Sequence, residues 1–277
     1  MYYPSKKEFI KFSEKANVIP VYKEILGDIL TPVSAFLRLK DRYSYLLESV
    51  EGTEKIARFS FIGIEPSLVF KSKGNQAEII ESGKSRKITT DMPLRELERI
   101  MNGFKPAILK NLPRFSGGMV GYMGYDVVRF FEDIPDNNPD DLRIPDSIFM
   151  LADILVIFDH SAHKIKVAVN AYLDKIRNPK SEIRNKYDNA IKKIDKVIKK
   201  LNSPEPVKKT KFKIKKHKIR SNFTKRGFEG LVKKAKEYIK AGDIIQVVPS
   251  QRFHTKLNCE PFDVYRSLRS LNPSPYM

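Results

Sequence analysis

The sequence predicts an α+β fold in which largely antiparallel sheets pack together, with helices outside. Three observations support this prediction. Short strand-like runs punctuated by Pro and Gly dominate from Val18 to Ser147, two later apolar runs joined by a short turn are typical of a hairpin, and several segments have helical apolar spacing. The 277 residues, 41% of them hydrophobic, are enough for the cores of one large or two ordinary domains.

The first two-thirds of the chain carries most of the expected strands. These strands are runs rich in apolar and aromatic side chains: Tyr43 to Val50, Arg58 to Ile64, Ser67 to Lys71, Ala77 to Ile80 and Gly118 to Tyr125. The apolar residues of Leu94 to Met101 predict a helix. The runs Ile148 to Phe158 and His163 to Ala171 predict a hairpin around Asp159, His160 and Ser161.

The last third carries the longest helical patterns. Glu182 to Asn202 is predicted to be an amphipathic helix with lysines on its solvated face. A second helix is expected over Lys225 to Ala241, with Thr224 as N-cap and Gly242 as its C-terminal stop. A strand over Asp243 to Leu257 and a short helix opened by Pro261 follow.

The positive charge of the chain is concentrated in one stretch. The net charge is +19, and residues 171–220 hold 18 Lys+Arg against 5 Asp+Glu, which is +13 of that total. No helix-turn-helix, zinc-finger or aromatic RNA-binding signature accompanies this stretch. The solvated face of a helix and a linker explain the charge, so a nucleic-acid-binding protein, which would show steep salt dependence, is disfavoured.

The sequence also disfavours membrane and secreted classes. No apolar run reaches the ~18 residues that a membrane span needs, and MYYPSKKEF has no apolar signal region. A single cysteine, Cys259, cannot form an intramolecular disulfide. We therefore expect a cytoplasmic protein with no membrane partner.

Two clusters suggest chemistry but favour structural roles. Gly117, Gly118, Gly121 and Gly124 match neither GxGxxG nor GxxxxGK[ST], so a tightly packed strand is favoured over a phosphate loop. Gly121 and Gly124 fit a place where another backbone approaches closely or where a strand bends. The carboxylate and imidazoles of Asp159, His160 and His163 sit at a turn without the further ligands of a closed metal site. A solvated turn is favoured there.

Five segments in order resemble a known family. They are LLESVEGTEKIARFSFIGIEPSLVF, FSGGMVGYMGYDVVRFFE, FMLADILVIFDH, FEGLVKKAKEYIKAGDIIQVVPSQRF and NPSPYM. These resemble consecutive signatures of component I, the large subunit, of anthranilate synthase, within the family of chorismate-utilising enzymes. They touch most of the chain from Tyr43 onward, and five matches in register are far more specific than any one. The alternative within the family is aminodeoxychorismate synthase component I, although LLES and YDVVRFFE resemble anthranilate synthase more.

The resemblance implies a two-step reaction on chorismate. Ammonia from a glutamine amidotransferase partner, component II, adds at C2 of the ring as the C4 hydroxyl leaves with help from Mg2+. Elimination of pyruvate then gives anthranilate, on the route to tryptophan. In this family the acid/base residues and the magnesium-binding glutamates lie in motifs after NPSPYM, so no catalytic or metal residue is carried over to this sequence.

The resemblance also implies a domain order. Residues 1–205 are expected to form the N-terminal regulatory domain, 206–219 a basic linker, and 220–277 the beginning of the chorismate-binding domain. The expectation is a component I chain truncated in its chorismate-binding half and inactive alone. A non-catalytic tryptophan-binding module is the competing class.

The feedback site for tryptophan can be carried over residue by residue. The resemblance places the inhibitor between Glu48 and Ser49 on one side and Pro275, Tyr276 and Met277 on the other. The chemistry suits an amino acid, because Glu48 can accept from its ammonium, Ser49 can donate to its carboxylate, and the last three residues supply apolar walls. Arg58 lies near the place of a basic pocket residue in the family, but a surface strand arginine is the favoured interpretation.

Overall fold

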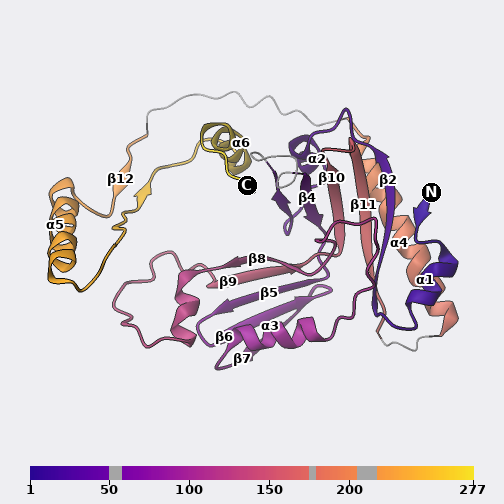
Figure 1. Ribbon diagram of the computed structural model, residues 1–277, viewed down its shortest axis with the longest axis horizontal. Coiled ribbons are helices and arrows are strands. Elements are labelled where there is room, and N and C mark those ends of the chain that lie inside the picture. The colour runs from indigo at the N-terminus through magenta and orange to yellow at the C-terminus, as the bar shows by residue number, and fades with distance from the viewer. Residues whose placement is uncertain (50–57, 175–178, 205–216) are drawn as a thin grey trace. The chain divides into compact units, whose positions relative to one another are not determined.

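A computed structural model describes residues 1–49, 58–174, 179–204 and 217–277 (Figure 1). The chain divides into two compact units, Met1–Pro206 with Pro273–Met277, and Val207–Asn272. Its paired strands are antiparallel apart from one isolated bridge, so the α+β prediction is confirmed for the described residues. The domain boundaries at 205 and 220 stay a prediction, and most of the basic linker lies outside the described residues.

A six-stranded sheet forms the centre of the first unit. In spatial order its strands are β1 (Tyr2–Tyr3), β2 (Val18–Leu26), β11 (Lys164–Tyr172), β10 (Ile154–Asp159), β4 (Phe59–Ile64) and β3 (Tyr45–Leu47). Helices α1 (Lys6–Phe12), α2 (Pro32–Leu39) and α4 (Lys180–Leu201) pack on one side of it (Figure 1). The predicted amphipathic helix is α4, whose buried face includes Tyr187, Ile194 and Leu201. Burial of this stripe fixes α4 against β11 and β2.

A cluster of apolar residues covers the opposite face of this sheet. It contains Tyr22, Phe61, Leu155, Ile157 and their neighbours. Leu109, Leu112 and Phe115, from the segment between α3 and β8, pack against it. This irregular segment therefore closes the core where no helix does.

A five-stranded sheet completes the first unit. Its order is β7 (Lys84–Thr89), β6 (Gln76–Glu81), β5 (Leu68–Lys73), β9 (Ser147–Leu151) and β8 (Met119–Met123), with α3 (Pro93–Asn102) against it and the 3-10 helix η1 (Tyr125–Phe130) after β8. Leu97 and Ile100 of α3 pack on a core that contains Phe70 and Ile79. The expected helix at Leu94 to Met101 is thus confirmed.

The prediction of a single strand over Ile148 to Phe158 is wrong. The strand is interrupted at Ala152 and Asp153. The residues before the interruption form β9 in the five-stranded sheet, and those after it form β10 in the six-stranded sheet. Both strands are apolar because each is covered, which is why periodicity did not reveal the break. The hairpin itself is confirmed, since β10 pairs with β11 from Asp159 opposite Lys164.

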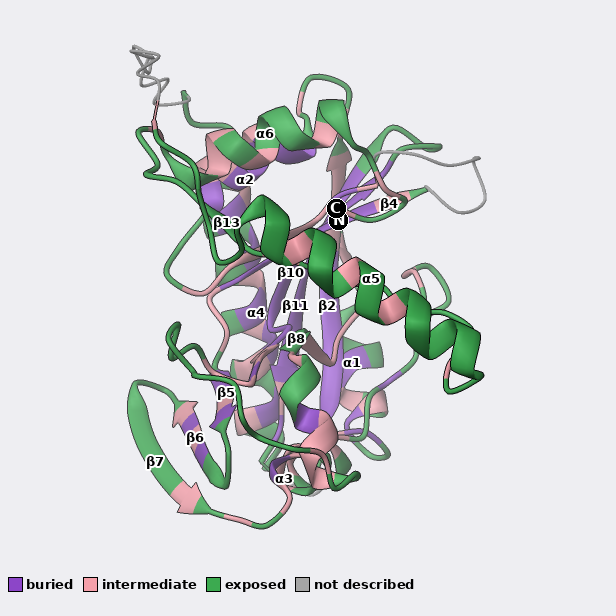
Figure 2. Ribbon diagram, turned by 90° about the vertical axis from the view of Figure 1, so that its left-hand side faces the viewer, coloured by how far each residue is buried: buried purple, intermediate pink, exposed green. Residues whose placement is uncertain are grey.

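The second unit contains β12 (Arg220–Ser221), α5 (Lys225–Ala241), β13 (Phe253–His254) and α6 (Pro261–Leu271). The predicted caps of α5 are confirmed, because the Thr224 side chain accepts the N–H of Gly227 and Gly242 has φ +82°. The strand expected over Asp243 to Leu257 is wrong except at β13, which pairs with β12 and with no other described strand. A strand needs a neighbour to satisfy its backbone groups, and none of the described strands pairs with residues 243–252. Figure 2 shows that α5, in the same unit, is largely exposed.

Candidate functional site

The two predicted segments meet by backbone pairing. The N–H of Glu48 donates to the carbonyl oxygen of Met277, and the N–H of Met277 donates to that of Glu48, each at 2.8 Å. This reciprocal exchange is the hydrogen-bonded pair of an antiparallel ladder. Glu48 directly follows β3, the edge strand of the six-stranded sheet, so residues near Met277 extend that edge.

The predicted site residues differ in burial. Glu48 is 3% exposed, whereas Tyr276 is 45% exposed and Pro275 is also on the surface. The Ser274 hydroxyl donates to the carbonyl oxygen of Tyr276 at 2.9 Å, which holds the Pro-fixed segment in a bend. The structure thus bonds Glu48 to Met277 directly. A pocket of indole size between the segments stays a prediction.

Ser49 lies beside this pair in a defined polar environment. Its N–H donates to the hydroxyl oxygen of Ser60 at 3.0 Å. Its own hydroxyl oxygen is buried and has no hydrogen-bond partner among the residues that the structure describes. Such a group is costly to leave unpaired.

Ser60 extends the polar chain to His160. Ser60 is fully buried within β4, and its hydroxyl oxygen lies 2.8 Å from Nε2 of His160, in the turn after β10. Desolvation lowers the pKa of His160, against the opposing effect of the carboxylates of Glu48 and Asp159. The imidazole is therefore neutral at neutral pH and can accept the Ser60 proton at Nε2.

Arg58 forms an ion pair with Asp159. Its Nε and Nη2 donate to the two carboxylate oxygens of Asp159 at 2.9 and 2.7 Å. The bidentate contact lowers the pKa of Asp159, which is 4% exposed. Because the Arg58 side chain is 47% exposed, the surface-arginine interpretation fits. Because Asp159 is held in this ion pair, the turn has a structural role.

The glycine-rich segment is a packed strand. A Cβ on Gly121 would overlap the carbonyl oxygen of Ile148 on β9, because β8 and β9 are paired there. Gly118, with φ +110°, lies just before β8 in a conformation that favours glycine. The close-approach prediction is therefore confirmed.

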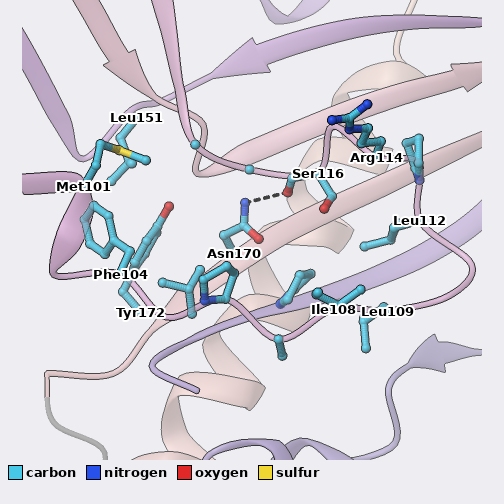
Figure 3. Close-up of a pocket in the computed structure, with 17 residues that line it drawn as sticks. Met101, Phe104, Ile108, Leu109, Leu112, Arg114, Ser116, Leu151, Asn170 and Tyr172 are labelled. Carbon is cyan, nitrogen blue, oxygen red and sulfur yellow. Dashed lines mark hydrogen bonds between the residues drawn. The ribbon is translucent and has the colours of Figure 1, made fainter. Parts of the chain in front are cut away.

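A cavity of about 440 Å³ lies elsewhere in the first unit (Figure 3). Its walls are mainly apolar and come from β2, the end of α3, the segment before β8, and β11; they include Phe104, Leu109, Leu112 and Tyr172. The buried Asn170 side chain donates to the carbonyl oxygen of Ser116 at 3.0 Å, as Figure 3 shows. None of Glu48, Ser49, Pro275, Tyr276 and Met277, all of which the structure describes, lines this cavity.

Sequence reasoning missed Ser60 and His160 as neighbours of the predicted site. A polar residue inside the otherwise apolar strand FSFIGI was a usable signal for Ser60. His160 was assigned only to a turn. Their meeting depends on the register between β4 and β10, which pairs Ser60 with Phe158.

Comparison with known proteins gives the family. A profile described as chorismate binding enzyme matches residues 42–277. The chain belongs to the chorismate-binding enzyme family. The chain is also 43% identical to anthranilate synthase component 1 of Aquifex aeolicus, over 99% of this chain and 55% of that protein. The corresponding protein of Acetivibrio thermocellus is 39% identical over 100% of this chain and 56% of its own length.

A solved structure is similar in fold to this chain. The crystal structure of anthranilate synthase component I from Streptococcus pneumoniae is similar with a TM-score of 0.64 and 29% identity, covering 90% of this chain and 53% of that one. The chain therefore spans about half the length of the curated relatives it matches.

Two further features bear on function. Among the described residues no group of three or more His, Cys, Asp or Glu side chains could hold a metal ion. No helix in the described ranges is both long and apolar enough to cross a membrane.

Proposed function

We propose that this chain carries the tryptophan-sensing part of an anthranilate synthase component I. The reaction of the whole protein would convert chorismate and glutamine-derived ammonia to anthranilate and pyruvate. The similarity to proteins named anthranilate synthase component 1 supports the assignment. The observation that carries the sensing role is the reciprocal pairing of Glu48 with Met277, which joins the LLES and NPSPYM segments.

The proposed ligand is free tryptophan, acting as a feedback inhibitor. Glu48 would accept from its ammonium. The hydroxyl of Ser49, which has no partner among the described residues, would donate to its carboxylate. Tyr276 and Met277, next to the prolines, would contact the indole. The Ser49 N–H is already bonded to Ser60, which leaves the hydroxyl as the donor that Ser49 offers.

The catalytic parts are proposed to come from outside these residues. The described residues hold no fitting set of metal ligands, and Mg2+ would be held by glutamates of the family motifs that follow NPSPYM. Ammonia would come from a glutamine amidotransferase, component II. We place the protein in the cytoplasm, where the proposed pathway operates.

The test is a calorimetric titration of the 277-residue chain with L-tryptophan. A second titration with indole serves as the control. The proposal expects saturable, one-to-one tryptophan binding and weaker indole binding, by about ten-fold or more, because indole lacks the ammonium and carboxylate. Equal affinities would show that Glu48 and Ser49 are not recognising an amino acid. No saturable binding of either would contradict the proposed site.

A further inference from the structure

We propose that His160 is a positioning residue of the tryptophan site and acts through Ser60 on the backbone of Ser49. This inference rests on the proposed function above. His160 belongs to neither of the two segments that form the proposed site. It reaches them only because β10 lies beside β4, and β4 beside β3, in the six-stranded sheet.

The first step is the geometry at Ser60. Its oxygen accepts the N–H of Ser49 at 3.0 Å and lies 2.8 Å from Nε2 of His160. Ser60 is fully buried, so its hydroxyl has no route to bulk water. One oxygen atom therefore links the imidazole to the backbone of Ser49.

The second step is the direction of these hydrogen bonds. Desolvation and the nearby His163 lower the pKa of His160, and Glu48 and Asp159 oppose them. A neutral ring with its proton on Nδ1 accepts at Nε2 from the Ser60 hydroxyl. That hydroxyl then presents its lone pairs to the Ser49 N–H. The ring is also held by Phe158, at 6.4 Å between centroids and 22° between planes.

The third step is the effect on Ser49. With its N–H bound to Ser60, Ser49 is fixed where its own hydroxyl is buried and unpartnered among the described residues. A ligand carboxylate can satisfy that hydroxyl only if the backbone stays in this place. Loss of the His160 contact would free the Ser60 hydroxyl to rotate and would loosen Ser49 without removing any atom that touches the ligand.

The alternative role for His160 is support of the β10–β11 turn alone. Its ring contact with Phe158 serves that role whether or not Nε2 is bonded. His160→Phe keeps an aromatic ring and removes the nitrogen, whereas His160→Gln keeps an amide able to reach the Ser60 hydroxyl. His163→Gln is the matched control, because His163 lies in the same turn and makes no hydrogen bond to Ser60 in the described structure.

The experiment uses the fluorescence anisotropy of L-tryptophan titrated with each variant of the 277-residue chain. The chain contains no tryptophan, so the signal comes from the ligand alone. We expect His160→Phe to weaken binding about three- to ten-fold, the range for loss of one hydrogen bond. Binding by His160→Gln and His163→Gln should stay within about two-fold of the unmodified chain.

A double-variant cycle tests whether His160 acts through Ser60. Ser60→Ala should weaken binding by a similar factor, and His160→Phe with Ser60→Ala should bind no more weakly than Ser60→Ala alone. Additive losses, unchanged binding by His160→Phe, or an equal loss in His163→Gln would overturn the inference. If circular dichroism shows that His160→Phe does not fold, the other two variants test the inference: Ser60→Ala should weaken tryptophan binding, and His160→Gln should not. An unmodified chain that binds no tryptophan would reject the proposed site and this inference together, whereas a chain that binds normally with His160→Phe rejects the inference only.

Discussion

At the residue scale, the proposed site depends on two neighbours with different tasks. Glu48 is buried and paired through its backbone to Met277, while Ser49 has its N–H occupied and its hydroxyl unpartnered among the described residues. The backbone bonds fix where the two side chains stand. In the proposal, the carboxylate of Glu48 and the hydroxyl of Ser49 are the groups that recognise the ligand.

Removing either recognition group should weaken tryptophan binding. A hydrogen bond to a charged group contributes roughly 1.5–3 kcal/mol, so Glu48→Gln and Ser49→Ala should each raise the Kd about ten-fold or more. Ser49→Phe, which fills the site, should abolish binding and, in a protein with full activity, feedback inhibition without loss of turnover. Calorimetry measures the first effect. Ser44→Ala is the control, because among the described residues the Ser44 hydroxyl bonds only to Asp41, before β3. A similar loss of binding there would mean a general disturbance of the chain.

The buried carboxyl of Asp153 should make stability depend on pH. Desolvation raises its pKa from 3.8 to about 6, against the hydrogen bonds from Ser67. A raised folded-state pKa means that the stabilising contribution is present below 3.8 and is lost as pH rises through 6. Relative to Asp153→Asn, the free energy of unfolding of the unmodified chain should fall by up to about 3 kcal/mol between acid and neutral pH. Urea unfolding at about pH 4 and about pH 7 measures the difference between the two chains. A difference that does not change with pH would contradict this account.

At the element scale, patterns predicted long, one-sided elements well. The amphipathic spacing of α4 and the caps of α5 identified both helices. The short helices α1 and α2 were missed, since seven or eight residues hold too few apolar positions to show a period. Their capping boxes, Ser5 with Glu8 and Thr31 with Ser34, were the usable signal.

The pairing of β8 with β9 should depend on Gly121. A Cβ there would overlap the carbonyl oxygen of Ile148, and a backbone atom cannot move aside as a side-chain tip can. Gly121→Ala should therefore lower the free energy of unfolding of the first unit by on the order of 2–4 kcal/mol. Gly230→Ala on α5, where an added Cβ meets nothing within 4 Å, should instead stabilise its helix by about 0.5–1 kcal/mol. Chemical denaturation measures the free energy of unfolding of both variants. An unchanged value for Gly121→Ala would show that β8 and β9 can separate at little cost.

At the scale of the whole molecule, the site could not have been found from periodicity. Glu48 and Met277 are near opposite ends of the sequence, and no local pattern predicts that their backbones pair. Only the family resemblance put them together. The contact between Ser60 and His160 was beyond both approaches, because it depends on the order of β10, β4 and β3 in one sheet.

The 277 residues alone should not convert chorismate. The matched relatives are about twice as long, and the described residues contain no cluster that could hold Mg2+. With chorismate, ammonium and Mg2+ present, anthranilate fluorescence should not rise above a protein-free control. Turnover that grows with protein concentration and disappears on removal of Mg2+ would show that catalytic groups lie within this sequence.

Amide hydrogen exchange tests the central claim, that tryptophan is sensed where Glu48 pairs with Met277. The reciprocal backbone bonds should slow exchange at both amides in the free chain, and saturating tryptophan should slow it further there and at Ser49, whose N–H is bound by Ser60. Peptides from β7, in the other sheet, should exchange at the same rate with and without the ligand. Unchanged exchange near residues 48 and 277 at a tryptophan concentration that saturates binding would contradict the account.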